Sequence, residues 1–270
     1  MADERLDAAL ASRGLARSRT VAAKLVTDGL VSVDGEWIVK PSHRVTPDAD
    51  IHVAQTDSYV SRGAHKLIGA LDAFPDVRVA GAHALDVGAS TGGFTQVLLE
   101  RGAASVIALD VGHGQLVPEL RAHPAVIVVE GRNVRELTAD ALVADSGREE
   151  PPSLVVGDLS FISLTLVLPP LVSAVGLAAD YVLLVKPQFE VGRGGIREGI
   201  VRSADLRADA VTRVLWSAWD LGLGTAGVVP SPIVGGAGNH EYLIRLNAAL
   251  GVNPTEWLKR INDMVRVERA

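Results

Sequence analysis

The stretch Leu85-Asp86-Val87-Gly88-Ala89-Ser90-Thr91-Gly92-Gly93-Phe94 decides the fold of this chain. It continues an apolar run that begins at Ala84 and leads into a helical pattern over Phe94–Arg101, so it predicts a glycine-rich turn between a buried strand and a helix. Downstream of this turn, short apolar runs keep alternating with helical patterns. That alternation is typical of a doubly wound α/β fold, Rossmann-like, with a mostly parallel sheet.

The other strands of this sheet are predicted from apolar runs bounded by turn residues. They are expected at Val106–Leu109, Val126–Val129, Leu154–Val156, Tyr181–Val185, Gly227–Val229 and Tyr242–Leu246. Helices are expected at Ser61–Phe74, Gln115–Arg121, Val134–Val143, Ile162–Val175, Ala204–Leu221 and Thr255–Val267. Because no helix separates the last two strands, we expect them to form an antiparallel hairpin at the sheet edge.

A separate block precedes the sheet. Its elements are two helices, a hairpin and a last strand, expected at Arg5–Ser12, Arg19–Thr27, Leu30–Val33, Trp37–Val39 and Ile51–Val53. The dipeptide Asp34-Gly35 is the turn signal of the hairpin, and the polar stretch Ala54–Ser58 follows the last strand. We therefore place a small α+β domain at residues 1–55, a linker at 56–60 and the doubly wound domain at 61–270.

Composition narrows the class of protein. The chain has 270 residues, of which 48% are hydrophobic, so a large and a small domain can each bury a core. The absence of cysteine excludes disulfides, thiolate metal sites and a cysteine nucleophile, and no metal site is expected. The formal net charge of -6 gives no global positive field, so nucleic acid would have to be held by local basic patches. The charged N-terminus, Met1–Arg5, does not resemble a signal peptide, and we expect a cytoplasmic protein.

One apolar segment requires a membrane test. Phe161–Ala179 carries no charged side chain, and a spanning helix needs about 20 such residues. Pro169 and Pro170 interrupt the segment and would leave backbone groups unpaired in lipid. We therefore expect a helix packed on the sheet and no stable membrane insertion.

The glycine-rich turn has the features of a ligand site. Ligands of doubly wound folds bind at the carboxyl ends of the strands, where glycines let the backbone approach and Ser90 and Thr91 add hydroxyl donors. Asp110 ends the next strand, where an acid can accept hydrogen bonds from a ribose diol. The glycine spacing differs from the dinucleotide fingerprint, and no Gly-Lys-Ser/Thr phosphate loop occurs. These features indicate an adenosyl-type ligand; the alternative is a tight turn that holds no ligand.

Further charges lie where strands end or begin. Asp158 follows the fourth strand, Lys186 follows the fifth, Glu241 opens a late strand, and Lys66 lies upstream of the sheet. The carboxyl ends of adjacent parallel strands share one rim, so Asp158 and Lys186 should lie close together and close to Gly88. A lysine after an apolar strand is costly to bury unless it is paired. The simpler alternative is a purely structural ion pair between Lys186 and Asp158.

At these residues the chain resembles the TlyA family of ribosomal RNA 2′-O-methyltransferases, which are also described as hemolysins. The segments similar to an S4-type RNA-binding domain are Arg5–Asp7, Gly14–Arg19 and Val31–Gly35. The segments similar to an FtsJ-type methyltransferase domain are Ser61–Leu67, Asp86–Phe94, Asp158–Leu164 and Val185–Glu190. The resemblance spans essentially the whole chain.

The resemblance implies a Lys-Asp-Lys-Glu catalytic tetrad, and the matching positions hold Lys66, Asp158, Lys186 and Glu241. It also implies S-adenosylmethionine as cofactor and a cytidine ribose in one or both ribosomal subunits as target. A ribose hydroxyl is a very weak acid, so methyl transfer benefits from a base, and a buried lysine beside a second cation suits that role. The residues expected to bind the cofactor are Asp86, Gly88, Ser90, Thr91, Gly92, Gly93, Phe94, Asp110, Asn133 and Asp158.

The N-terminal block carries the expected RNA-binding surface. Residues 8–27 hold several cations and no acid, and such a patch would contact phosphates. The candidate RNA-binding residues are Arg5, Arg13, Arg17, Arg19, Lys24 and Arg62. A second candidate is a glycine-rich loop that carries Arg193, Arg197 and Arg202. For both groups the alternative is an ordinary solvated surface.

Three other functions remain open at this point. The chain could be a membrane-active hemolysin, for which Phe161–Ala179 is the candidate segment. It could be an RNA-binding ribosome-assembly factor without catalysis, which the complete tetrad argues against. It could also be a small-molecule methyltransferase, which the N-terminal block makes a poorer explanation.

Overall fold

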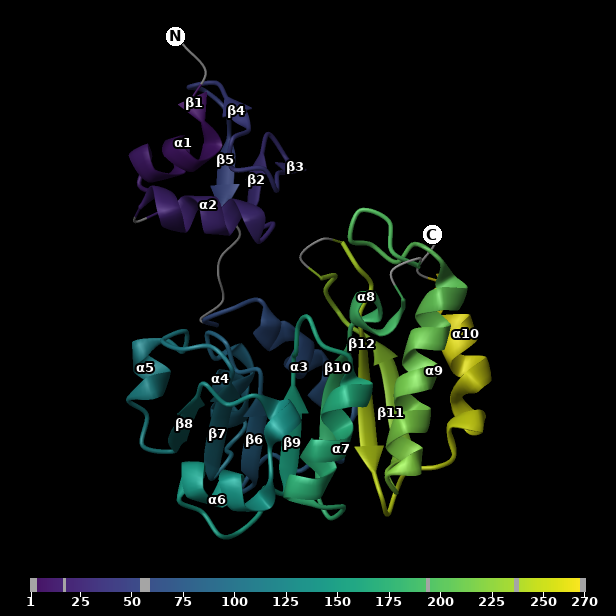
Figure 1. The fold of residues 1–270 in the computed structure, drawn as a ribbon. Coiled ribbons are helices and arrows are strands. Elements are labelled where there is room, and N and C mark those ends of the chain that lie inside the picture. The colour runs from purple at the N-terminus through teal and green to yellow at the C-terminus, as the bar shows by residue number, and fades with distance from the viewer. Residues whose placement is uncertain (1–3, 17, 54–58, 193–194, 236–237, 268–270) are drawn as a thin grey trace. The chain divides into compact units, whose positions relative to one another are not determined.

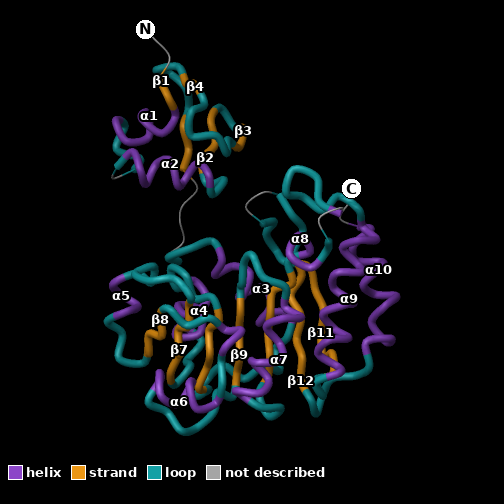
Figure 2. Tube along the Cα trace, in the orientation of Figure 1, coloured by secondary structure: helices purple, strands orange, loops and turns teal. Residues whose placement is uncertain are grey.

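The computed structural model describes residues 4–16, 18–53, 59–192, 195–235 and 238–267. The chain divides into two compact units, Met1–Tyr59 and Val60–Ala270, which are described separately below. Figure 1 labels the helices and strands of both units, and Figure 2 colours them by type.

The N-terminal unit is a small α+β domain. Its elements are β1 (Glu4–Arg5), α1 (Leu6–Ser12), α2 (Arg19–Thr27), β2 (Val31–Val33), β3 (Glu36–Trp37), β4 (Arg44–Val45) and β5 (Ile51–Val53). One sheet has the order β3-β2-β5, and β1 pairs separately with β4. Both turn residues between β2 and β3, Asp34 and Gly35, have positive φ, which matches the twist of a two-residue hairpin. Apolar residues of both helices, such as Leu10 and Val26, pack on the inner face of the sheet.

The second unit is a doubly wound α/β domain. Its first elements are α3 (Gly63–Ala73), β6 (His83–Val87), α4 (Gly93–Glu100), β7 (Ser105–Asp110), α5 (Pro118–Arg121), β8 (Val126–Glu130), η1 (Val134–Glu136) and α6 (Ala139–Ser146). They are followed by β9 (Leu154–Gly157), α7 (Leu164–Val175), β10 (Asp180–Val185), α8 (Pro187–Glu190), α9 (Ala204–Asp220), β11 (Gly224–Pro230), β12 (Tyr242–Asn247), η3 (Pro254–Trp257) and α10 (Leu258–Val267). The sheet order is β11-β12-β10-β9-β6-β7-β8, and β12 runs antiparallel to both of its neighbours. The predicted fold class is therefore confirmed, including the antiparallel edge hairpin.

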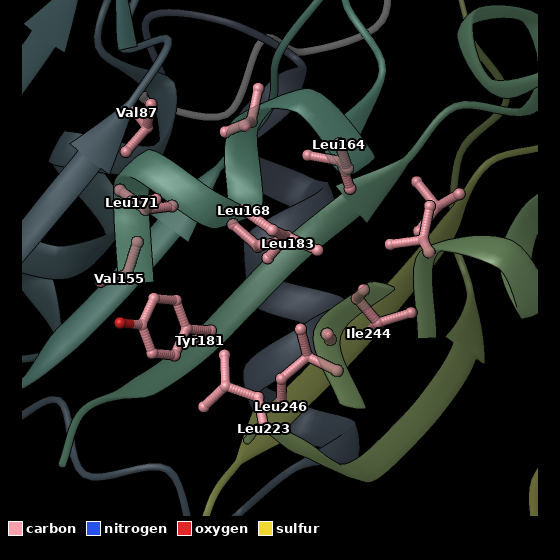
Figure 3. Packing of buried hydrophobic residues seen from close by; sticks show 14 of the residues in the cluster. Val87, Val155, Leu164, Leu168, Leu171, Tyr181, Leu183, Leu223, Ile244 and Leu246 are labelled. Atoms are coloured by element: carbon pink, nitrogen blue, oxygen red, sulfur yellow. The ribbon is translucent and has the colours of Figure 1, made fainter. Parts of the chain in front are cut away.

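Both faces of this sheet are buried by helices. Helices α6, α7 and α9 cover one face, and α3 and α4 cover the other (Figure 1). Along β6, Leu85 and Val87 point into the first layer, while Asp86 reaches Thr95 of α4 in the second. Figure 3 shows Leu168 and Leu171 of α7 packed against side chains of β9 and β10 in the first layer. Because both faces of the sheet are buried, the polar residues that follow the carboxyl ends of the parallel strands are held at one edge of the packed core.

The structure corrects several predicted elements. The single helix expected over Val134–Val143 is wrong: the 3₁₀ turn η1 comes first, and Thr138 then caps α6 by accepting from Ala141 N at 3.1 Å. The expected helix over Gln115–Arg121 begins only at Pro118, where the ring suits a first helical position. The short elements β1, β4 and α8 were not predicted, because two to four residues show no readable periodicity.

The segment tested for membrane insertion contains α7, which the tandem prolines do not prevent from forming. Six side chains of α7 are buried against the rest of the unit. Among the residues that the structure describes, no helix combines the length and the apolar character that crossing a bilayer requires.

Candidate active site

Three neighbouring parallel strands end at one rim of the sheet. The strand β9 lies between β6 and β10, with Gly157 opposite both Val87 and Leu183. The residues that follow these strands are Gly88, Asp158 and Lys186. Gly88 has φ +83°, and a Cβ there would lie 3.2 Å from the backbone oxygen of Asp158. Glycine therefore allows the turn after β6 to approach the turn after β9 closely.

Four charged side chains converge at this rim as a row of alternating sign. Lys186 Nζ lies 2.6 Å from Asp158 Oδ1, and Lys66 Nζ lies 3.2 Å from Asp158 Oδ2. On its other side, Lys66 Nζ lies 2.7 Å from Glu241 Oε2. Both lysines and Glu241 are buried, with 6%, 8% and 4% of Lys66, Lys186 and Glu241 exposed. Burial opposes the ionisation of Asp158, but the two ammonium groups hold the pKa of its carboxyl below the usual range.

Lys66 reaches the rim from the opposite helix layer because a glycine at the start of α4 lets α3 approach α4 closely. Gly93 begins α4, and a Cβ there would lie 3.1 Å from the backbone nitrogen of Ala64 in α3. Gly63 begins α3, and a Cβ there would lie 3.7 Å from Asp158 Oδ2. The N-terminal turn of α3 therefore packs directly against the glycine-rich turn, which places Lys66 beside Asp158.

Two cavities meet at the row of charges. The larger, about 920 Å³, runs from the glycine-rich turn past Asp110 and Asn133 to Phe161. The smaller, about 230 Å³, is lined by both lysines and by Arg62 of the α3 N-terminus. The residues that line both cavities are Gly88, Ser90, Asp158 and Ser160. Among the described residues, Glu241 lines neither of these cavities and contacts the site through its ion pair with Lys66.

The polar residues at the larger cavity are held in place by the backbone. Asp110 accepts from Ser90 N at 2.9 Å with one oxygen and from Gly112 N at 2.7 Å with the other. Each carboxylate oxygen has a second lone pair for a ligand. Asn133 lines the cavity, but its side-chain oxygen caps η1 by accepting from Arg135 N at 3.1 Å. Asn133 therefore keeps its amide nitrogen and one lone pair of its oxygen for contact with a ligand.

The other residues expected to bind the cofactor divide into two groups. Thr91, Gly93 and Phe94 line the smaller cavity, whereas Gly92 lines neither. Gly92 has φ +102°, and a Cβ there would overlap the side chains of Leu116 and Leu120. Gly92 therefore shapes the turn rather than lining a cavity.

Asp86 is fully buried beneath the turn and also lines neither cavity. Its Oδ2 accepts from Thr95 Oγ1 at 2.6 Å, while Oδ1 has no hydrogen-bond partner within the part of the chain that the structure describes. Burial raises the pKa of Asp86 from 3.8 to about 7, against the opposing effect of the Thr95 hydrogen bond.

Sequence reasoning missed a clamp between the two loops that carry Asp158 and Lys186. The buried carboxylate of Glu190 in α8 accepts from Leu164 N at 2.7 Å and from the Ser163 hydroxyl, at the N-terminus of α7. Burial raises the pKa of Glu190, although these two hydrogen bonds oppose the shift. Glu190 ends the Val185–Glu190 segment that resembles the methyltransferase domain, so the residue could have been singled out. The sequence does not show that it contacts the N-terminus of α7.

An aromatic pair, also missed, stands at the mouth of the larger cavity. Phe161 is 91% exposed and has φ +65°, a strained conformation for a residue with a large side chain. Its ring centroid lies 5.2 Å from that of Phe189 in α8. An exposed phenylalanine held in a strained backbone beside a cavity is a feature of functional sites.

The candidate RNA-binding residues have different surroundings. Arg5 donates to Asp7 Oδ2 at 2.7 Å, and Arg19 Nε lies 3.3 Å from Asp7 Oδ1. Arg13 donates to the backbone oxygens of Ala49 and Thr46 at 2.8 and 2.9 Å, so its guanidinium supports the fold of the N-terminal unit. Lys24 is exposed on α2.

Other predicted basic positions are only partly described. Arg17 and Arg193 lie outside the described residues. In the loop after α8, Arg202 pairs with Glu198 at 3.0 Å. Arg197 forms an isolated antiparallel bridge with Ile200.

Comparison with known proteins supplies the family. The sequence profile of the FtsJ-like methyltransferases matches residues 59–248, and that of the S4 domain matches residues 4–51. TlyA of Mycobacterium tuberculosis, named a 16S/23S rRNA (cytidine-2'-O)-methyltransferase, is 52% identical over 246 residues, which cover 90% of this chain and 89% of the relative. Hemolysin A of Brachyspira hyodysenteriae is 38% identical over 240 residues, covering 88% of this chain and 98% of the relative.

A solved structure of a hemolysin from Streptococcus thermophilus is similar to the whole chain. It matches with a TM-score of 0.76 and 37% identity, covering 100% of this chain and 98% of that one. The predicted resemblance is confirmed: this chain is a methyltransferase of the FtsJ-like family and belongs to its TlyA group, in which an S4 domain precedes the methyltransferase domain.

Proposed function

We propose that this chain transfers a methyl group from S-adenosylmethionine to the 2′-hydroxyl of a cytidine in ribosomal RNA, in the cytoplasm. The observation that carries the proposal is the row Glu241–Lys66–Asp158–Lys186 at the junction of two cavities. One cavity has the size of a cofactor site, since such sites occupy about 300–1,000 Å³. The other brings a substrate group directly against two lysines. The mycobacterial relative carries this activity in its name.

The residues of the larger cavity fit S-adenosylmethionine. Asp110 has the position and the lone pairs to accept the two ribose hydroxyls, and the hydroxyl of Thr91 in the glycine-rich turn can donate to a carboxylate. Within the described part of the chain, Oδ1 of Asp86 beneath this turn has no hydrogen-bond partner and would fit an ammonium group only through a bridging water, because Asp86 lines neither cavity. When bound, the cofactor supplies an electrophilic methyl group on a positively charged sulfur.

Each member of the charged row has a distinct role in this proposal. Lys186 lines the smaller cavity and, as the neutral amine, accepts the proton of the 2′-hydroxyl at Nζ. Lys66 lines the same cavity and stabilises the negative charge that develops on the ribose oxygen. Asp158 holds both lysines, and Glu241 balances the charge of Lys66 from behind. The alternative of a purely structural ion pair does not explain why both lysines face one cavity.

The exposed ring of Phe161, beside the half-buried Phe189, suits the base of the target nucleotide. Aromatic faces stack on unpaired bases, a contact worth about 1–3 kcal/mol per base. A ribose whose base stacks on Phe161 is out of the helical stack, so its 2′-hydroxyl can enter the smaller cavity. We assign RNA docking to an S4 domain at residues 1–55, joined through a linker at 56–60 to the methyltransferase domain at 61–270.

The test is methyl transfer by the purified full chain, with S-adenosylmethionine labelled in the methyl group and isolated 16S- or 23S-containing subunits as acceptors. The proposal predicts label in a cytidine ribose, located by mapping 2′-O-methyl groups, and none with the Lys186→Ala protein. No label in either subunit or in naked ribosomal RNA would refute it. The same protein without cofactor should cause no leakage from dye-loaded vesicles; leakage would favour the hemolysin alternative.

A further inference from the structure

Ser160 contacts the buried ammonium of Lys186 but has no assigned part in the reaction. Its hydroxyl accepts a hydrogen bond from Lys186 Nζ at 2.7 Å. Asp158, two residues earlier on the same loop, faces the same nitrogen at 2.6 Å. A single short segment after β9 therefore supplies Lys186 with an ion-pair partner, Asp158, and a hydrogen-bond acceptor, Ser160. Ser160 is exposed, whereas Lys186 is buried, and Ser160 lines both cavities where they meet.

We propose that Ser160 is a positioning residue that directs the lone pair of neutral Lys186 toward the target hydroxyl. The inference rests on the proposed function and concerns how its base is oriented. A lysine nitrogen has four tetrahedral directions, one of which is the bond to Cε. Ser160 takes one of the other three by accepting a hydrogen bond, and the carboxylate of Asp158 lies 2.6 Å from the nitrogen as its ion-pair partner, so a direction toward the smaller cavity is left for the substrate.

The hydrogen bond to Ser160 matters because deprotonation leaves two N–H groups and one lone pair on Lys186. With Ser160 in place, one N–H group is engaged, the charge of Asp158 attracts the other, and the lone pair takes the remaining direction. With Asp158 alone, rotation about the Cε–Nζ bond lets a hydrogen point at the substrate instead, and such an amine cannot accept a proton. Ser160 thus selects the productive rotamer at the proton-transfer step, where orientation counts most.

The charges around Lys186 explain why a neutral acceptor is suited to this place. Asp158 faces it directly, Lys66 from α3 lies behind Asp158, and Glu241, which precedes β12, lies behind Lys66; Asp86 from β6 lies near Asp158. Glu190 from α8 is committed to the N-terminus of α7. A second carboxylate on Lys186 would hold its proton more tightly and oppose its use as a base. A hydroxyl orients the nitrogen without adding negative charge.

The experiment compares Ser160→Ala and Ser160→Thr with wild type in single-turnover methyl transfer to the ribosomal subunit, at saturating cofactor and across pH. We expect Ser160→Ala to slow transfer about tenfold, the effect of one lost hydrogen bond to a charged group, with cofactor and RNA affinity unchanged. The acidic limb of the pH–rate profile of Ser160→Ala should move to lower pH, because the Lys186 ammonium with one acceptor fewer releases its proton more readily. Ser160→Thr keeps the hydroxyl, so it should restore both the transfer rate and the position of the acidic limb.

Ser173→Ala, an exposed serine on α7, is the matched control and should behave as wild type. A Ser160→Ala protein with the wild-type rate and pH limb would overturn the inference. A Ser160→Thr protein that resembles Ser160→Ala would also overturn it, because bulk and not the hydroxyl would then matter. Wild type without transfer, or Lys186→Ala with full activity, would instead overturn the proposed function on which the inference rests.

Discussion

Lys66 and Glu241 form a buried ion pair, Nζ to Oε2 at 2.7 Å, although they come from opposite ends of the methyltransferase unit. Lys66 lies on α3, before the first strand of the sheet, and Glu241 immediately precedes its last strand, β12. Glu241 lines neither of the two cavities described above, so its contribution reaches the site through the position of the Lys66 ammonium. Since removing one partner of a buried ion pair is destabilising, loss of Glu241 would weaken the fold and the site together.

Lys186→Ala should abolish methyl transfer while leaving cofactor and RNA binding within a few-fold. A general base typically contributes 10²–10⁴-fold, and Lys186 is the lysine that contacts both Asp158 and Ser160 at the cavity. Single-turnover rates and separate binding titrations check this prediction. A loss of less than about tenfold would show that Lys186 is not the base.

Asp110→Ala should weaken S-adenosylmethionine binding by about 1–3 kcal/mol. The side chain accepts from Ser90 N and Gly112 N, so its removal costs ligand contacts and also loosens the turn. Asp110→Asn, which keeps one acceptor oxygen, should lose less. Calorimetry is the measurement, and unchanged affinity in both variants would exclude Asp110 from the cofactor site.

Gly92→Val should prevent cofactor binding by displacing the turn. The position has φ +102°, and a side chain would overlap Leu116 and Leu120. Gly114→Ala is the matched control, since it also has positive φ but no heavy atom within 4 Å of the added Cβ. Both variants carry backbone strain, so only Gly92→Val should abolish binding. Equal affinity in the two variants would contradict the steric argument.

Asp86→Asn should make the free energy of unfolding less dependent on pH between about 4 and 7. Burial raises the pKa of this carboxyl from 3.8 to about 7, so in that range the folded protein binds more protons than the unfolded chain. Stability from this group is therefore present below pH 4 and lost as the pH rises through 7, by about 4 kcal/mol at most. Urea denaturation at pH 5 and pH 8 measures it. An equal pH slope in wild type and variant would refute the assignment.

Phe161→Ala should reduce transfer to RNA without changing cofactor affinity. The exposed ring and its partner Phe189 form the proposed stacking surface, and its loss should cost about 1–3 kcal/mol in the apparent affinity for the acceptor. Phe161→Trp keeps an aromatic face and should retain most activity. Wild-type kinetics for Phe161→Ala would remove this pair from the substrate site.

The sequence alone determined the architecture, since alternating apolar runs and helical patterns suffice to predict a doubly wound sheet. It also placed Asp158 and Lys186 at one rim, because parallel strands end on the same side. It failed at Val134–Val143 and at α8, where short elements are set by caps such as Thr138 and by loop packing. The periodicity of apolar residues is read over one or two helical turns, so it does not show where one short element ends and the next begins.

Only the tertiary structure decided which role each polar or charged residue of the site has. Glu190 clamps α7, Ser160 contacts Lys186, and Asp86 is buried beneath the glycine-rich turn rather than lining a cavity. The first two contacts join segments 26 residues apart in the sequence, and the burial of Asp86 depends on how α4 covers β6. Periodicity specifies which face of an element is buried, but the partner met there is fixed only when the layers pack. The sequence therefore predicts where the site lies, and the packing of the layers determines which partner each side chain contacts and so which role it has.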